Sequence, residues 1–153
     1  MKRIFVFLIV AILGCTMFCT PVGAVSASKE TNTTIEYLDN GDYIETIITW
    51  EESPTRSSKT ASKTSNYKNS DGDIMWSVTV RGTFTYNGTT SSCTACSHST
   101  TAPASSWTIK SASSSKSGNT ATANAVATFK TLLITKDYSM SVSLTCSPNG
   151  TLS

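Results

Sequence analysis

The stretch Ile74-Met-Trp-Ser-Val-Thr-Val-Arg-Gly-Thr-Phe-Thr-Tyr86 decides the fold class of this chain of 153 residues. Every second residue, beginning with Ile74, is apolar or aromatic, with Gly82 as the exception, and most residues between them are polar. This period of two predicts an antiparallel strand with one buried face, which carries Trp76, Val78 and Phe84. Gly82 lies on the same inward row, where a glycine indicates a bulge or a close approach of another group.

The same period recurs along most of the chain after its first 30 residues. We expect strands within Thr34–Glu52, Ser106–Ser113, Thr120–Phe129 and Tyr138–Cys146. The lysine-rich segment Ser57–Asn69 fits either an edge strand or a loop. About seven short strands separated by turns predict an all-β protein, an antiparallel β-sandwich that is immunoglobulin-like or similar.

An Asn-Gly pair marks the first hairpin. Asn40 and Gly41 lie between two runs of β-branched and aromatic residues within Thr34–Glu52. Such a pair predicts a tight turn in which both central residues take positive φ. Ala121, Ala123, Ala125 and Ala127 form a row of small residues later in the chain, so we expect the large side chains of Trp76 and Phe84 to pack opposite this row.

The first residues have the pattern of an export signal. Lys2 and Arg3 precede an apolar run from Ile4 to Leu13. Small residues then provide two possible cleavage sites, one after Ala24 and one after Ala27. We therefore expect residues 1–27 to be a cleaved signal peptide, with residues 28–153 forming one secreted domain. Within that domain, residues 28–56 would form an acidic N-terminal hairpin and residues 57–153 the body.

Two alternatives concern the membrane. The apolar run is short for a transmembrane anchor and lacks a basic stop sequence, so we expect the membrane to be contacted only through the signal peptide. Ile12-Leu13-Gly14-Cys15 loosely resembles a bacterial lipobox, in which Cys15 would carry a lipid, although Leu13 fits that pattern poorly.

The charge balance excludes one class of partner. Lys2 and Arg3 account for the formal net charge of +2, so the chain after the signal is close to neutral. Nucleic-acid binders normally present a concentrated basic face, which this balance argues against. Acidic residues crowd the region before Arg56 and basic residues predominate after it, which suggests that the acidic head folds against the basic body. The alternative is a weakly cationic face for polyanionic cell-wall polymers.

Three cysteines remain after the signal: Cys93, Cys96 and Cys146. In an exported protein they predict one disulfide and one spare thiol. Cys146 ends the inward row of the last strand, but alternation does not choose between Cys93 and Cys96 as its partner, because residues three apart face opposite ways in a strand. The alternative is a tetrahedral zinc site formed by Cys93, Cys96, His98 and Cys146. A single C-x-x-C motif and export weigh against this site, and we expect no cofactor.

No catalytic constellation is recognisable in the sequence. His98 lies in a Ser/Thr-rich segment without a nucleophile motif, and Glu36 and Glu45 fit a solvated hairpin face better than a hydrolase pair. Among the tryptophans, Trp76 and Trp107 lie on inward rows. Trp50, at the end of the amphipathic hairpin, is therefore the best candidate for an exposed binding residue.

Several strings resemble a family of small exported proteins of unknown function from Gram-positive bacteria. They are Trp76–Gly88, Cys93, Ser106-Trp107, Lys116–Asn119 and Leu144–Ser153. The resemblance implies that Cys93 and Cys146 form the disulfide, and Cys96 departs from the family pattern.

Together these features lead us to expect a secreted, non-catalytic binding module. Its partner would be a cell-wall polymer, a glycan or a protein. The alternatives are an unrecognised secreted enzyme, such as a hydrolase, and a structural or toxin-like protein that acts by assembly.

Overall fold

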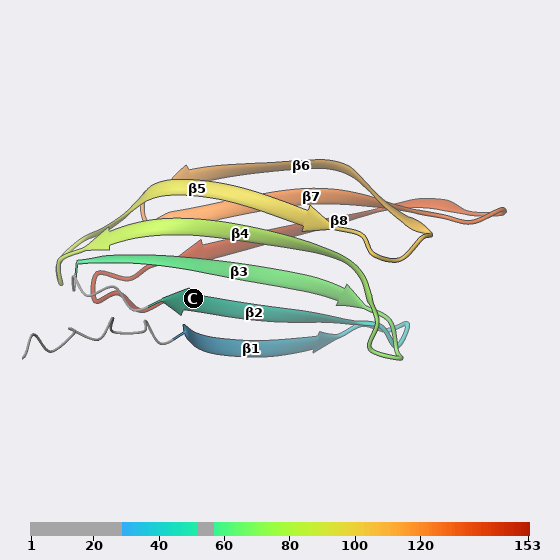
Figure 1. Ribbon diagram of the computed structural model, residues 1–153, viewed down its shortest axis with the longest axis horizontal. Helices are drawn as coiled ribbons and strands as arrows, with labels where there is room; N and C mark the ends of the chain where they lie inside the picture. The colour runs from blue at the N-terminus through green and yellow to red at the C-terminus, as the bar shows by residue number, and fades with distance from the viewer. Residues whose placement is uncertain (1–28, 52–56) are drawn as a thin grey trace, which may run out of the picture.

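A computed structural model describes residues 29–51 and 57–153 of the chain, and its described part is all-β (Figure 1). The expected signal peptide and Cys15 lie outside the described residues. These described residues form eight strands: β1 (Lys29–Tyr37), β2 (Tyr43–Glu51), β3 (Ser58–Lys68), β4 (Ile74–Tyr86), β5 (Ser91–Thr101), β6 (Trp107–Ser117), β7 (Thr120–Lys130) and β8 (Thr135–Thr145). They form two antiparallel sheets, one with the order β1-β2-β3-β4-β5 (sheet A) and one with the order β6-β7-β8 (sheet B).

The strand order is a simple up-and-down meander within each sheet. Every hydrogen-bonded pair of strands is consecutive in the chain. Immunoglobulin domains instead connect their sheets by Greek-key crossovers, so the immunoglobulin-like form of the predicted sandwich is wrong. Short turns join β1 to β2, β3 to β4, β4 to β5, β6 to β7 and β7 to β8, and such turns favour antiparallel pairing of neighbours in the chain. The residues 102–106, which include Pro103, carry the chain from sheet A to sheet B.

Strand β3 is an interior strand of sheet A, neither the edge strand nor the loop considered for Ser57–Asn69. Its polar residues are accommodated because their hydroxyl groups pair with those of the neighbouring strands. Ser65 and Thr46 hydroxyls lie 2.9 Å apart, and Thr64 and Thr79 hydroxyls lie 2.8 Å apart. Such cross-strand hydroxyl pairs stabilise a sheet without requiring apolar side chains.

Strand β5 is the additional strand that raises the number from about seven to eight. A register shift opposite Thr83 and Phe84 leaves Thr94 without a direct partner on β4. As a result Cys93 pairs with Phe84 and Cys96 with Gly82, and both partners belong to the inward row of β4. The two cysteines therefore share one face of the sheet, and the expectation that they face opposite ways is wrong. A bulge adds one residue and so reverses the alternation.

The first hairpin forms as predicted, but its turn has a different backbone. Gly41 has φ of 87°, and no residue other than glycine has positive φ among those described, so Asn40 does not. Leu38 N donates to Asp42 O at 2.9 Å, and Gly41 N donates to Leu38 O at 3.1 Å. This is a longer loop closed by one left-handed glycine, the usual alternative to the two-residue turn.

The core lies between the inward rows of the two sheets, where β4 contacts β7 and β8. Trp76, Val78, Val80 and Phe84 of β4 are at most 1% exposed. They face the alanine row of β7 and Val142 and Leu144 of β8, so large side chains pack against small ones as expected. Each large apolar side chain buried in this way stabilises the fold by about 1.5–3 kcal/mol.

One side of the sandwich is closed and the other is open. On the closed side, β5 runs beside β6, where Cys93 N donates to Gly118 O at 2.8 Å and His98 Nδ1 lies 3.0 Å from Ser114 Oγ. On the open side, β1 contacts β2 alone among the described strands. Lys68 and Glu45 form an ion pair of 2.9 Å that joins the acidic hairpin to β3.

Candidate functional site

A cavity of about 260 Å³ opens at one end of the sandwich, between the two sheets. Sheet A contributes Tyr67, Met75 and the turn residues that precede β2 and follow β3. Sheet B contributes the first residue of β6 and aromatic residues near the β7–β8 turn. The lining residues are Asn40, Asp42, Tyr67, Asn69, Met75, Trp107, Phe129 and Tyr138.

Trp107 is the centre of an aromatic cluster in this cavity. The centroid of its ring lies 4.9 Å from that of Tyr138, 5.2 Å from Phe129 and 5.3 Å from Tyr67. Trp76 stacks on the same ring from the core side at 6.3 Å. The cluster forms because the inward rows of β3, β6, β7 and β8 carry aromatic residues near this end of the sandwich. Trp107 and Tyr67 are 7% and 6% exposed, whereas Phe129 and Tyr138 are half-buried, so these two present the accessible ring surface.

A polar group beside the rings supplies hydrogen-bonding atoms. Tyr67 donates its hydroxyl to Asp42 Oδ2 at 2.5 Å, and Asn40 Nδ2 donates to the same oxygen at 2.7 Å. Burial, followed by the hydrogen bond to Asp42, raises the pKa of Tyr67 to about 12. Tyr67 is therefore a protonated donor at neutral pH, and it holds the Asp42 carboxylate at the rim of the cavity.

Asn69 closes the β3–β4 turn much as Asn40 closes the β1–β2 turn, where Asn40 Oδ1 accepts from Asp42 N at 3.2 Å. Asn69 Oδ1 accepts hydrogen bonds from Asp71 N at 3.1 Å and from Asp73 N at 2.8 Å. These bonds close the β3–β4 turn, which forms one wall of the cavity. The turn Asn69–Asp73 thus supports the wall of the cavity, and the Asn69 side-chain oxygen is already hydrogen-bonded within the turn.

The arrangement is suited to ligand binding, and its described lining contains few side chains that could act as an acid, a base or a nucleophile. Asp42 is the one carboxylate among the described lining residues, whereas glycoside hydrolysis by acid and base uses two. His98 lies on β5, along the closed side of the sandwich, and is not a lining residue. Aromatic rings beside a few oriented polar groups are typical of small-ligand sites.

Trp50, the predicted binding residue, lies at the far end of β2 from this cavity. Its ring is partly buried against the core, and Lys59 Nζ lies 5.7 Å from the ring centroid. Trp76 and Trp107, predicted to be inward, are buried. No tryptophan platform that includes Trp50 is therefore formed among the described residues.

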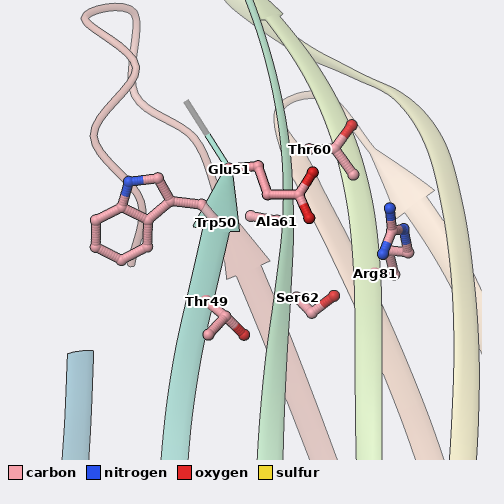
Figure 2. A pocket seen from close by; sticks show the side chains of 7 residues that line it. All are labelled: Thr49, Trp50, Glu51, Thr60, Ala61, Ser62 and Arg81. Atoms are coloured by element: carbon pink, nitrogen blue, oxygen red, sulfur yellow. The ribbon is translucent and has the colours of Figure 1, made fainter. Parts of the chain in front are cut away.

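A second, smaller hollow of about 80 Å³ lies on the outer face of sheet A near Trp50. Figure 2 shows Glu51, Thr60, Ser62 and Arg81 on its near side, while the Trp50 ring points to the other side of the sheet. Its lining is hydroxyl-rich, and although Trp50 is one of the lining residues, alternation turns the Trp50 ring away from the other side chains (Figure 2). This hollow lacks the volume of a small-ligand site, which is about 300 Å³ or more.

The three described cysteines are free thiols in this structure. Cys93 and Cys146 are buried, and burial raises the pKa of both thiols. A neighbouring thiol also raises the pKa in each case, Cys96 for Cys93 and Cys93 for Cys146. The pairing of Cys93 with Cys146 stays a prediction.

The zinc site considered for Cys93, Cys96, His98 and Cys146 is not assembled. Within residues 29–51 and 57–153, no three His, Cys, Asp or Glu side chains are grouped so that they could hold a metal ion. His98 Nδ1 lies beside Ser114 Oγ, and Cys96 Sγ donates to Ser115 O at 3.3 Å. Both side chains are therefore engaged with β6 rather than directed together at Cys146.

The residues that form the cavity could not be singled out from the sequence as one site. Phe129 and Tyr138 belong to two separate inward rows in the sequence, Tyr67 lies in a segment that fits either an edge strand or a loop, and Asp42 and Asn40 are turn residues. A detectable signal was present, because several inward rows end in an aromatic residue. Recognising its meaning requires the strand order that brings those ends together.

Comparison of the chain with protein-family models, with curated proteins and with solved structures gives no match. In the described part of the chain, no helix is long and apolar enough to cross a membrane.

Proposed function

We propose that this protein is exported and acts as a non-catalytic binding module that recognises a saccharide unit of a glycan or cell-wall polymer. The observation that carries the proposal is the convergence of four aromatic residues with Asp42 and Asn40 in one cavity. Sugar rings have an apolar face of C–H groups and a rim of hydroxyl groups. A site for them therefore needs an aromatic surface next to hydrogen-bonding oxygens and amides.

Phe129 and Tyr138 are the residues for the apolar face of the sugar. Both are half-buried and line the cavity, whereas Tyr67 and Trp107 are buried behind them. Trp107 packs against both Phe129 and Tyr138 and fixes their ring positions. A rigid aromatic surface loses little conformational entropy when a ligand binds, which favours affinity.

Asp42 and Asn40 are the residues for the sugar hydroxyls. Asp42 is oriented by Tyr67, and its carboxylate has further lone pairs that can accept from a hydroxyl group. The volume of the cavity, about 260 Å³, is near the lower limit for small-molecule sites. The site therefore fits one sugar ring, or the end of a chain, better than a long oligosaccharide.

The test is a binding titration of the purified protein with purified wall fractions and soluble saccharides, followed by tryptophan fluorescence and calorimetry. We expect Tyr138→Ala and Asn40→Ala each to weaken binding by about tenfold, which corresponds to roughly 1.4 kcal/mol. Trp50→Ala is the matched control, since it removes an aromatic ring at the other end of β2, and we expect it to leave the affinity unchanged.

Two results would reject the proposal. One is the absence of binding to every wall fraction and saccharide tested. The other is saccharide binding that Trp50→Ala abolishes and Tyr138→Ala does not. Thermal unfolding of each variant separates a lost contact from a lost fold.

A second candidate function is self-assembly, which the edges of the sheets favour. β1 is an edge strand of sheet A, and its Ile35 and Tyr37 are 51% and 76% exposed. Exposed edge strands with apolar side chains pair readily with another chain. Sedimentation velocity over a range of concentrations tests this function. Association that Ile35→Lys abolishes would support it, and a monomer at all concentrations would exclude it.

A further inference from the structure

The turn between β7 and β8 carries three exposed apolar side chains. Leu132, Leu133 and Ile134 are 104%, 94% and 57% exposed, which makes them the most exposed aliphatic group among the described residues. The turn is well closed: Thr131 N donates to Ile134 O at 2.8 Å, and Thr131 Oγ1 accepts from Ile134 N at 3.2 Å. Figure 1 shows this hairpin projecting past the other strands at one end of the molecule.

Such a composition is the opposite of what a hairpin turn needs. Turns favour Gly, Asn, Asp and Ser, and the β1–β2 and β3–β4 turns of this chain follow that rule. Three consecutive large aliphatic residues at a turn gain nothing from the fold, because none is buried by it. An exposed apolar group of this kind marks a surface that contacts another phase or partner.

The shape of the tip favours a lipid surface over a protein. A stable protein interface uses about 20–30 residues on each side. A convex tip with three apolar residues cannot supply such an area. A bilayer, in contrast, accepts a narrow apolar projection, because its interface deforms around side chains that enter by about 5–10 Å.

The charges around the tip complement anionic headgroups. Lys130 and Lys136 flank the apolar residues on the two strands, and both are exposed. The nearest carboxylate along the hairpin, Asp137, is engaged by Lys110 Nζ at 2.5 Å and by Thr128 Oγ1 at 2.6 Å. The hairpin therefore presents an apolar tip with two cationic side chains, Lys130 and Lys136, directly behind it.

Two aromatic residues lie behind the lysines. Lys136 Nζ lies 4.9 Å from the ring centroid of Tyr138, and Phe129 precedes Lys130 on the neighbouring strand. Going inward from the tip, the surface is thus first aliphatic and then cationic, so the aliphatic side chains can enter the acyl boundary while the lysines reach the phosphates. The aromatic rings behind the lysines line the cavity and are not part of this surface.

We propose that the β7–β8 hairpin docks on a membrane with anionic headgroups. Leu132, Leu133 and Ile134 enter the boundary of the acyl chains, while Lys130 and Lys136 lie at the lipid phosphates. This inference goes beyond the proposed saccharide binding and does not depend on it, because the tip residues do not line the cavity.

The test is co-sedimentation of the folded chain lacking residues 1–27 with vesicles of equal parts phosphatidylglycerol and phosphatidylcholine. We expect the wild-type protein to bind these vesicles and to bind phosphatidylcholine vesicles far more weakly. The double variant Leu132→Ser/Leu133→Ser loses at least about 100-fold in affinity, because two exposed leucines leave the acyl boundary. The double variant Lys130→Gln/Lys136→Gln loses about 30-fold, and only on the anionic vesicles.

Matched controls use residues away from the tip. Ile35→Ser removes an exposed apolar side chain from β1, and Arg81→Gln removes an exposed charge from β4. We expect both to bind vesicles as the wild type does. All these side chains are exposed, so circular dichroism is expected to show the same fold in every variant.

Three results would overturn the membrane proposal. The first is a wild-type protein that does not sediment with the anionic vesicles. The second is binding that the leucine substitutions leave unchanged. The third is a wild-type protein whose tip mediates self-association, seen as an oligomer in sedimentation velocity that Leu132→Ser/Leu133→Ser converts to a monomer. None of them bears on saccharide binding, which Tyr138→Ala and Asn40→Ala test separately.

Discussion

The ring of Phe84 lies directly over Gly82, two residues earlier on the same face of β4. A Cβ atom built on Gly82 would lie 2.5 Å from Phe84 Cζ and 3.1 Å from the Cβ of Ala121 on the opposite sheet. The glycine on the inward row is therefore a close approach, one of the two meanings that its position suggested. It leaves room for a large aromatic side chain between two closely packed sheets.

We predict that Gly82→Ala destabilises the protein by about 1–3 kcal/mol, because the new methyl group overpacks the core. Unfolding in urea, followed by tryptophan fluorescence, measures the change. Thr85→Ala, at an exposed position on the outer face of the same strand, serves as the control. A variant Gly82→Ala as stable as the wild type would show that Phe84 can move aside at no cost.

Leu144→Ala tests the core from the side of sheet B. Leu144 is fully buried, and its truncation leaves a cavity that the surrounding strands fill only in part. We predict a loss of about 2–5 kcal/mol in the free energy of unfolding. Ser141→Ala on the same strand is exposed and is expected to change that free energy by less than about 0.5 kcal/mol.

Alkaline pH offers a test of Tyr67. Its pKa is about 12 in the folded protein, above the ordinary value of 10.0. Between these values the folded state keeps a proton that the unfolded state has lost, so the contribution of Tyr67 to stability is complete below pH 10 and is lost as pH rises toward 12. We predict that Tyr67→Phe flattens this part of the curve of unfolding free energy against pH. Equal curves for both proteins would contradict the buried hydrogen bond to Asp42.

The thiols of the reduced protein are expected to react at different rates. Burial raises the pKa of Cys93 and Cys146, which lowers their thiolate fraction and shields them from reagents, while Cys96 is half-buried. Timed alkylation with iodoacetamide and mass spectrometry of the peptides is expected to show Cys96 modified first in the native protein. All three are expected to react at similar rates in urea. Faster native alkylation at Cys146 than at Cys96 would contradict the described packing.

The intact mass of the protein secreted by its native host tests the processing. We predict a chain that starts at Val25 or Ser28, with one thiol alkylated before reduction and three after it. That result corresponds to one disulfide, for which Cys93 and Cys146 are the predicted pair. A chain that starts at Cys15 with added lipid would instead establish a membrane-tethered protein, and a chain with Lys2 retained would reject the signal peptide.

The sequence predicts the fold well where one face of a strand is apolar. β4, β7 and β8 were recognised from their alternation, and their inward rows hold the buried residues. β5 was not recognised, because its inward residues are Cys, His and Thr and the bulge at Thr94 interrupts their period. The interior position of β3 could not be predicted for a related reason. Its residues are mostly polar, and their hydroxyl groups form hydrogen bonds with partners on neighbouring strands.

The candidate site was less predictable than the fold. Trp107 was correctly placed inward, but its ring neighbours in the cavity come from two sheets, Tyr67 from β3 and Phe129 and Tyr138 from the β7–β8 hairpin. Alternation tells which face a residue occupies and does not tell which strand ends meet. The exposed tip, Leu132–Ile134, could be read only once the turn was located, because an apolar run inside an all-β sequence otherwise indicates a buried strand.

The meander has a consequence for the order in which this chain folds. Each hydrogen-bonded strand pair is formed by neighbours in sequence, so each ladder needs only the closure of a short loop, a topology that favours rapid folding. Sheet A is complete at Thr101, before any residue of sheet B is needed. A chain that emerges from its N-terminal end can therefore build five strands in succession, and docking of β7 and β8 over Val78 and Phe84 becomes the final step that makes the structure cooperative.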